Sequence, residues 1–267
     1  MILHTFDALL KRLGGRGSRA ARARRTMRLR PVRAQRRIRA GDSRRRALIT
    51  VGAVLVTLAL VSLSLPVVAA EAPVRLLALG DSLTAGYGLD RAEAFPAQLE
   101  RALRGQGLDV VVENGGISGI TSVGGRARLK ALLGAKRAAQ PDAVIVELGI
   151  NDALRGTDPE VTYGNLDAIL EHLKARGIPV LLAGMRILPQ WRANDGARFE
   201  AIYPSLAARH GVPLYPFFLE GVAGEPALNL PDGLHPNAAG IQEIVRRITP
   251  AAAELVRAAA EKRTHSP

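Results

Sequence analysis

Residues 76–89 read LLALGDSLTAGYGL, an apolar run that ends on Gly80-Asp81-Ser82 and continues into small and glycine-rich sequence. A short, continuous apolar run is typical of a strand that is buried on both faces of a parallel sheet. In open α/β sheets, ligands collect at the carboxyl ends of such strands. The stretch therefore predicts a buried strand that delivers the Ser82 hydroxyl to the ligand-binding edge of a sheet.

Four further apolar runs follow along the chain: DVVVENG, AVIVELG, PVLLAG and VPLYPF. Longer amphipathic segments separate them, such as DPEVTYGNLDAILEHLKARG, where Asp158 can cap a helix, Pro159 fits its first turn and Gly177 its end. Strands that alternate with helices over short connections predict a doubly wound α/β domain. We expect a single flavodoxin-like three-layer α/β/α domain with a mostly parallel five-stranded sheet.

The positive charge of the chain is concentrated at its start. Residues 1–46 contain sixteen of the 37 Lys and Arg residues and only two acids, whereas the remainder has 21 basic and 22 acidic side chains. The net charge of +13 therefore belongs to this basic leader, which we expect to be disordered. No nucleic acid is expected as a partner of the rest of the chain.

An uncharged segment, residues 47–70, follows the leader and ends in small residues after a proline. This order is typical of an export signal, and cleavage after Ala70 would make Glu71 the first mature residue. The segment is also longer than the ~20 residues that span a bilayer, so an uncleaved membrane anchor is the alternative. Residues 43–48 loosely resemble a twin-arginine signal, and Met27 is an alternative start. We therefore expect a leader at 1–46, an apolar export segment at 47–70 and one folded domain at 71–267.

Five residues near predicted strand ends and in a late turn have the chemistry for acyl transfer, which needs a nucleophile, a base and donors for the oxyanion. Ser82 offers a hydroxyl, although a serine there can also be a helix cap. His235 offers a base, with Asp232 three residues earlier to orient it, although prolines and a glycine would bend this segment in any case. Asn151 and the N–H of Gly119 are candidate oxyanion donors; each is also an ordinary turn residue.

Elimination also favours His235 as the base. The sequence has five histidines. One lies in the leader, one in the carboxyl-terminal tail and two on predicted helices: His4, His265, His172 and His210.

The chain has no cysteine, so disulfides and thiolate metal sites are excluded.

Four blocks, LLALGDSLTAGYGL, NGGISGIT, VELGIND and DGLHPN, resemble in their order and spacing those of the SGNH (GDSL) hydrolase family. The similarity runs from about Arg75 to about Ala260 and is closest to the bacterial periplasmic thioesterase I, arylesterase and lysophospholipase branch. The lack of a G-x-S-x-G elbow argues against the α/β-hydrolase alternative. The resemblance implies a catalytic set of Ser82, Asp232 and His235, and an oxyanion hole made by Ser82, Gly119 and Asn151. It implies no metal and no cofactor.

Two departures from the family pattern concern substrate preference and loop support. Ile120 follows Gly119 where relatives usually carry an acidic or polar residue, and residues 190–200, QWRANDGARFE, replace a segment that in relatives commonly reads Pro-Asn-Tyr-Gly. Arg186 and Trp191 are candidates for substrate contact, with packing favoured for Trp191.

The resemblance implies an exported, monomeric serine esterase that hydrolyses small carboxylic esters and acyl thioesters through an acyl-enzyme on Ser82. Membrane contact is expected only through residues 47–70, if these are retained. Two alternatives remain open at this point. One is a carbohydrate O-acetylesterase with the same site. The other is a catalytically idle envelope protein that is tethered by residues 47–70.

Overall fold

Five parallel strands form the centre of the computed structural model, which describes residues 72–134, 140–188 and 196–265. The sheet order is β2-β1-β3-β4-β5, and every neighbouring pair runs parallel. The strands are β1 (Val74–Leu79), β2 (Val110–Asn114), β3 (Ala143–Glu147), β4 (Val180–Ala183) and β5 (Leu214–Tyr215). The five apolar runs of the sequence are these strands, so the predicted α/β fold is confirmed.

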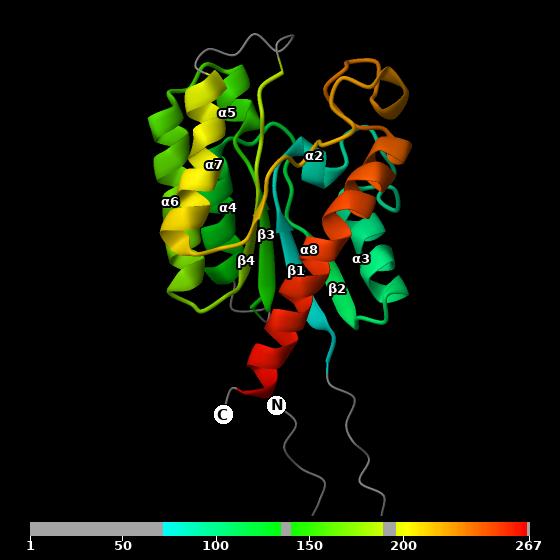
Figure 1. Ribbon diagram of the computed structural model, residues 1–267, viewed down its shortest axis with the longest axis vertical. Helices are drawn as coiled ribbons and strands as arrows, with labels where there is room; N and C mark the ends of the chain where they lie inside the picture. Colours follow the sequence, from blue (N-terminus) through cyan, green and yellow to red (C-terminus); the bar gives the residue numbers. More distant parts are fainter. Residues whose placement is uncertain (1–71, 135–139, 189–195, 266–267) are drawn as a thin grey trace, which may run out of the picture. The chain divides into compact units, whose positions relative to one another are not determined.

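Helices cover both faces of the sheet (Figure 1), which is why the strands are apolar on both faces rather than alternating. Helices α3 (Phe95–Gly105) and α8 (Ala238–Thr264) pack against each other on one face. Helices α4 (Ser122–Gly134), α6 (Pro159–Lys174) and α7 (Gly196–His210) cover the other. The direction of strand succession reverses at β1, so the carboxyl ends of β1 and β3 flank the switch point where such folds bind ligands.

The boundaries of α6 follow the capping chemistry predicted from the sequence. The side chain of Asp158 accepts a hydrogen bond from the N–H of Glu160 at 3.0 Å, and Pro159 is the first helical residue. The helix ends at Lys174, and Gly177 then adopts a left-handed conformation with φ of 64°.

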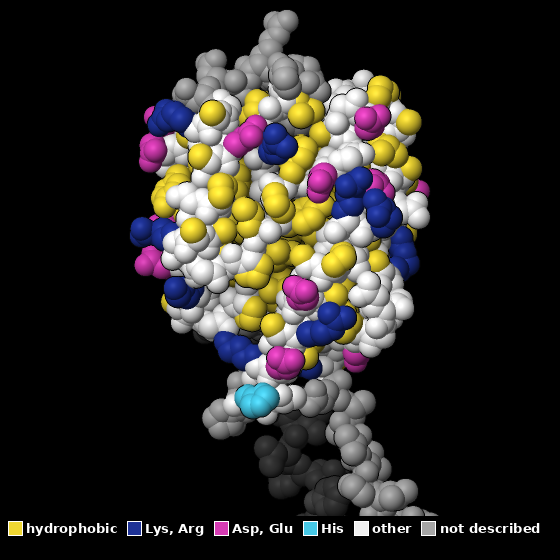
Figure 2. Space-filling view, viewed as in Figure 1, with side chains coloured by type: hydrophobic (Ala, Val, Ile, Leu, Met, Phe, Trp, Pro, Cys, Tyr) yellow, Lys and Arg dark blue, Asp and Glu magenta, His cyan; other side chains and the backbone are white. Residues whose placement is uncertain are grey.

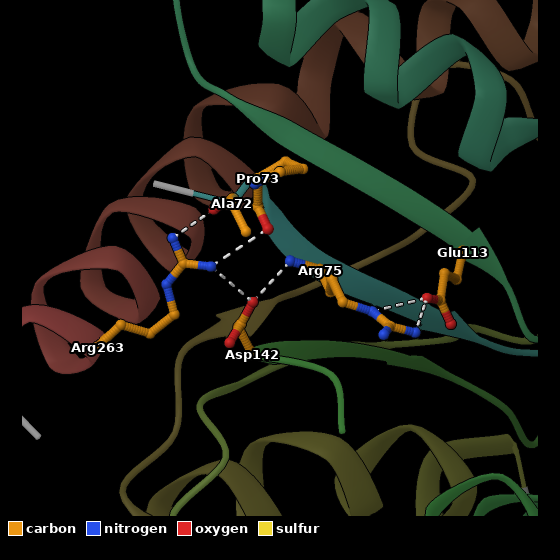
Figure 3. Close-up of polar contacts among 6 residues, drawn as sticks. All are labelled: Ala72, Pro73, Arg75, Glu113, Asp142 and Arg263. Carbon is orange, nitrogen blue, oxygen red and sulfur yellow. Dashed lines mark hydrogen bonds and ion pairs between the residues drawn. The ribbon is translucent and has the colours of Figure 1, made fainter. Parts of the chain in front are cut away.

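A cluster of polar contacts fixes the first described residues at the amino-terminal edge of the sheet (Figure 3). Arg263 of α8 donates to the carbonyl oxygens of Ala72 and Pro73, at 2.6 and 3.2 Å, and to Asp142 at 3.3 Å. Asp142 also accepts from the N–H of Arg75 at 2.8 Å, and the Arg75 side chain pairs with Glu113. These contacts tie the chain directly after the predicted export segment to the last helix.

Apolar side chains gather in a groove beside α8 on the face seen in Figure 2. Its volume is about 440 Å³, and it is lined by residues 177–180, residues 210–213 and parts of α6 and α8. These residues surround the amino ends of β4 and β5, and none of the candidate functional residues lines the groove.

The leader, the apolar segment 47–70 and Trp191 lie outside the described residues. No helix within the described ranges is long and apolar enough to cross a bilayer.

Candidate active site

Ser82, His235 and Asp232 form a continuous hydrogen-bonded chain at the carboxyl edge of the sheet. Ser82 is the first residue of the short helix α2 (Ser82–Ala85), which directly follows β1. The Oγ of Ser82 lies 2.9 Å from Nε2 of His235, and Nδ1 of His235 lies 2.7 Å from Oδ2 of Asp232. The structure thus brings together a hydroxyl and an imidazole that are 153 residues apart in the sequence.

The loop before α8 holds His235 in this direction. Oδ1 of Asp232 accepts hydrogen bonds from the N–H groups of Leu234 and His235, both at 2.9 Å, and Gly233 supplies the left-handed turn residue, with φ of 67°. The N–H of Leu230 donates to the His235 carbonyl at 2.7 Å and closes the loop. Asp232 and His235 are therefore fixed by the backbone and by each other.

Asp232 stays ionised near neutral pH. Partial burial raises the pKa of Asp232, but the hydrogen bonds from His235 and Leu234 and the charge of a protonated imidazole outweigh it, so the pKa lies below its ordinary value. An ionised carboxylate only accepts hydrogen bonds, so it places the proton of a neutral His235 on Nδ1. Nε2 is then the basic nitrogen, and it faces the Ser82 hydroxyl.

Tyr87 adds an aromatic wall that the sequence patterns did not single out. Its ring lies 4.4 Å from the His235 ring, centroid to centroid, with the planes tilted by 34°. Gly86 and Gly88 on either side adopt left-handed conformations, and the N–H of Tyr87 donates to the Ser82 carbonyl at 3.1 Å. In the sequence, the feature that could have indicated a role for Tyr87 is the Gly-Tyr-Gly triplet directly after α2.

Close backbone packing places α2 against its neighbours. A Cβ on Gly80 would lie 2.1 Å from Oγ1 of Thr84, and one on Gly116 would lie 2.5 Å from the backbone nitrogen of Ala85. Only glycine fits these two positions, so the loop after β2 can approach the helix that carries Ser82. The first N–H groups of an α-helix have no acceptor inside the helix, which leaves the N–H of Ser82 available to a ligand.

Asn151 lies in α5 (Ile150–Leu154), the short helix after β3, so it shares the switch point with Ser82. Its Nδ2 donates to Oδ2 of Asp81 at 3.0 Å. An amide nitrogen carries two N–H groups, so one remains for a substrate. A carboxylate neighbour thus orients this candidate oxyanion donor.

Gly119 lies in the loop after β2 and adopts a left-handed conformation, with φ of 76°. Its carbonyl accepts from the Arg155 guanidinium at 2.8 Å, and among the described residues its N–H has no hydrogen-bond partner. Ile120, the departure from the family pattern, supports the loop by packing, because a Cβ on Gly124 would lie 2.5 Å from its side chain. Apolar contact takes the place of polar support here.

A buried carboxylate joins α5, which carries Asn151, to the chain that follows Gly119. Asp152, next to Asn151, accepts from the N–H of Ser122 at 2.7 Å and from its hydroxyl at 2.6 Å. Asn165 of α6 donates to the same hydroxyl at 3.2 Å. Because Ser122 begins α4, directly after the Gly119 loop, these bonds fix the position of that loop relative to α5.

The other described side chains flagged in the sequence take no part in this chain of bonds. Arg186 is exposed, pairs with Glu200 at 3.4 Å and lies 5.7 Å from the centre of the Phe217 ring. His210 bonds Asp167 of α6 at 2.7 Å. Within the described ranges, no group of three or more His, Cys, Asp or Glu side chains is placed to hold a metal ion.

Comparisons with known proteins agree on one family. The profile of the GDSL-like lipase/acylhydrolase family matches residues 78–242. An arylesterase of Vibrio mimicus is 43% identical over 168 residues, which are 63% of this chain and 82% of that protein. Thioesterase 1/protease 1/lysophospholipase L1 of Escherichia coli (strain K12) is 44% identical over 162 residues, 61% of this chain and 75% of that protein. The crystal structure of AlinE4, an SGNH-hydrolase family esterase, is 45% identical and covers 69% of this chain and 97% of its own, with a TM-score of 0.58.

Proposed function

The chain belongs to the GDSL-like lipase/acylhydrolase family and is a serine esterase of the GDSL type, and on that premise we propose that Ser82 is its nucleophile. His235 is the general base in this proposal, and Asp232 orients the base. The observation that carries the assignment is the chain of two hydrogen bonds, 2.9 Å from Ser82 to His235 and 2.7 Å from His235 to Asp232. A side chain that acts as base must lie within this reach of the proton it takes.

The first half of the reaction transfers the acyl group to the enzyme. Nε2 of His235 takes the proton of the Ser82 hydroxyl as Oγ attacks the carbonyl carbon of the ester. The carbonyl π bond becomes a lone pair on the oxyanion. When the oxyanion collapses, the bond to the leaving oxygen breaks, and the imidazolium gives its proton to that oxygen. An alcohol departs and the acyl group stays on Ser82.

Three donors hold the oxyanion in this proposal: the backbone N–H groups of Ser82 and Gly119, and the side-chain amide of Asn151. The absence of a protein partner for the Gly119 N–H among the described residues, and the bond that leaves Asn151 one free N–H, support the assignment. Donors that are already oriented stabilise the developing charge without reorganisation.

The second half of the reaction releases the acid. A water molecule attacks the acyl carbonyl while His235 takes its proton, and the new oxyanion is held by the same donors. Collapse breaks the bond to Oγ, and His235 returns the proton to Ser82. The enzyme is restored and one carboxylic acid leaves for each ester consumed.

Small carboxylic esters and acyl thioesters are the proposed substrates. The nucleophile and the oxyanion donors act on the acyl carbonyl, which both classes contain, whereas the leaving atom needs only a proton from His235. One relative at 44% identity is named a thioesterase and lysophospholipase, and another at 43% is named an arylesterase. Both names support an acyl carbonyl as the reacting group.

A chain-length series tests the proposal. Hydrolysis of p-nitrophenyl esters and acyl-coenzyme A thioesters is measured beside that of acetylated sugars, with Ser82→Ala as the blank. We expect turnover of aryl esters and thioesters that is lost in Ser82→Ala. Turnover confined to acetylated sugars would select the O-acetylesterase alternative. Equal rates for the wild type and the blank would select the idle one.

We also infer that the enzyme is exported and that its mature chain begins at Glu71. The basic leader, the uncharged segment 47–70 and the small residues at its end support this. The bonds from Arg263 to the carbonyls of Ala72 and Pro73 agree with a domain that begins at this point. Amino-terminal sequencing of the protein recovered from an exporting host tests it; a chain that retains residues 47–70 would favour the anchored form.

A further inference from the structure

Two buried carboxyl groups lie directly beneath the proposed nucleophile, and the reaction described above uses neither. Asp81, which caps α2, and Glu147, the last residue of β3, are both 0% exposed. Oε2 of Glu147 accepts from the Thr84 hydroxyl at 2.7 Å and from the N–H of Asp81 at 3.3 Å. Oε1 of Glu147 has no hydrogen-bond partner among the described residues. Glu147 thereby ties the central strand to both ends of the serine turn.

This arrangement costs stability. Burial raises the pKa of Asp81 to about 7, although bonds from Leu83 and Asn151 act against it, and burial together with the Asp81 charge raises the pKa of Glu147 well above its ordinary value. Asp152 from α5 and the Tyr203 hydroxyl from α7 are the other titratable groups that face the pair. Among the described residues no Lys or Arg forms an ion pair with either carboxyl group. Apolar side chains of similar size would be less costly at both positions.

The Asp81 carboxylate makes two bonds that bear on the oxyanion hole. Its Oδ1 accepts from the N–H of Leu83 and fixes the first turn of α2, which presents the N–H of Ser82. Its Oδ2 accepts from Nδ2 of Asn151. One side chain therefore contacts the supports of two of the three proposed oxyanion donors.

We propose that Asp81 is a positioning residue of the oxyanion hole that acts through Asn151. The proposal rests on the proposed function, in which Asn151 donates to the oxyanion. The amide of an asparagine can face either way, since its oxygen and nitrogen are nearly equal in size. Turned over, Asn151 would present its carbonyl oxygen to the oxyanion and repel it. Above its pKa of about 7, Asp81 is an ionised carboxylate that only accepts hydrogen bonds, so it binds the NH₂ end and excludes that orientation.

Asp81→Asn removes this selection with almost no change in shape. Oδ1 of an asparagine can still accept from the N–H of Leu83, but its NH₂ group then faces Asn151 and favours the turned-over amide. The N–H that serves the oxyanion is replaced by an oxygen. An interaction present only in the transition state is lost, so kcat falls while KM stays nearly constant.

A double-mutant cycle tests the proposal with Asp81→Asn, Asn151→Ala and the double variant, all assayed on one p-nitrophenyl ester at a pH above the Asp81 pKa of about 7. We expect Asn151→Ala to lower kcat by about 10²–10³. Asp81→Asn alone should lower kcat at least about tenfold, with KM changed less than about twofold. In the Asn151→Ala background, the same change should lower kcat less than about threefold, because its target is gone. A merely structural role would not produce this loss of effect.

Asp81→Ser and Asp142→Asn separate positioning from folding. A serine still caps α2 but is too short to hold Asn151, so kcat should fall in Asp81→Ser as it does in Asp81→Asn. Because the cap is kept, the melting temperature of Asp81→Ser should stay closer to that of the wild type than the melting temperature of Asp81→Asn does. Asp142→Asn alters a carboxyl group at the opposite edge of the sheet (Figure 3), and should lower the melting temperature without changing kcat.

Two results would overturn the inference. One is that Asp81→Asn lowers kcat by the same factor in the wild-type and in the Asn151→Ala background. The other is that kcat is unchanged in both Asp81→Asn and Asp81→Ser. If Asp81→Asn does not fold, Asp81→Ser takes its place in the same cycle. Wild-type turnover in Asn151→Ala is a different outcome, because it would remove Asn151 from the proposed oxyanion hole itself.

Discussion

The ring of Tyr87 lies 4.4 Å from the ring of His235 and covers one side of the imidazole, although half of the tyrosine, 51%, is exposed to solvent. The contact restricts the movement of the imidazole ring. It also places an aromatic surface next to the proposed nucleophile.

Tyr87→Ala should lower kcat/KM for aryl esters because the imidazole loses its aromatic neighbour. Aromatic pairs contribute about 0.5–1.5 kcal/mol beyond buried area, which corresponds to a loss of about 2- to 12-fold. Tyr87→Phe is the matched control and should keep at least half of wild-type kcat/KM, since the contact uses the ring. A loss in Tyr87→Phe as large as in Tyr87→Ala would instead assign the effect to the hydroxyl.

Asp232→Asn should lower kcat by about 10²–10⁴ while leaving the fold intact. The asparagine can still accept from the N–H groups of Leu234 and His235 through its oxygen, but its NH₂ group cannot accept from Nδ1, so the imidazole tautomer is no longer selected. The measurement is kcat on a p-nitrophenyl ester, with circular dichroism and the melting temperature as controls. Turnover within threefold of wild type would remove Asp232 from the proposed catalytic set.

The sequence was sufficient to predict the strands because each is a short, continuous apolar run. Burial on both faces of a parallel sheet imposes that pattern locally. Ser82 and His235 could be proposed together because their motifs follow a known order, and the turn residues around His235 imposed a direction on its side chain. The same is true of α6, whose cap and first-turn proline are adjacent in the sequence.

Tyr87, Ile120 and the pair of Asp81 and Glu147 could not be predicted, since their roles depend on contacts between distant segments. Glu147 ends the apolar run that forms β3. Nothing in that run indicates that its side chain points inward and accepts a hydrogen bond from Thr84, which lies 63 residues earlier in the sequence. Ile120 departs from the family pattern, and only the approach of Gly124 shows how its side chain is used.

Arg263→Ala should destabilise the domain without changing turnover. Its guanidinium binds the carbonyl groups of Ala72 and Pro73, just before β1, and the Asp142 carboxylate (Figure 3). These groups lie at the amino ends of the strands, whereas Ser82 follows the carboxyl end of β1. Hydrogen bonds to charged groups contribute about 1.5–3 kcal/mol each, less where solvent reaches them, so a loss of about 1–3 kcal/mol in unfolding free energy is expected. Urea denaturation measures this loss, and limited proteolysis should cut the variant faster near Ala72. A tenfold fall in kcat would contradict the separation of this cluster from the site.

Glu147→Gln should change how stability depends on pH. In the wild type, the folded state keeps a proton on Glu147 at pH values where the unfolded chain has already lost it, because burial raises the pKa of Glu147 in the folded state. The unfolding free energy contributed by this group therefore falls as pH rises above about 4.3, by up to about 1.4 kcal/mol per pH unit. The raised pKa of Asp81, about 7, acts in the same direction up to that pH.

Glutamine does not titrate, so between pH 5 and pH 8 the unfolding free energy of Glu147→Gln relative to that of the wild type should rise by about 1–3 kcal/mol. Urea denaturation at the two pH values measures this, with the exposed Glu171→Gln of α6 as the control for loss of one charge. The lowered pKa of His172 affects the wild type and Glu147→Gln equally, so it cancels between these two proteins. If the curves of wild type and Glu147→Gln run parallel across this range, Glu147 does not retain its proton in the folded enzyme.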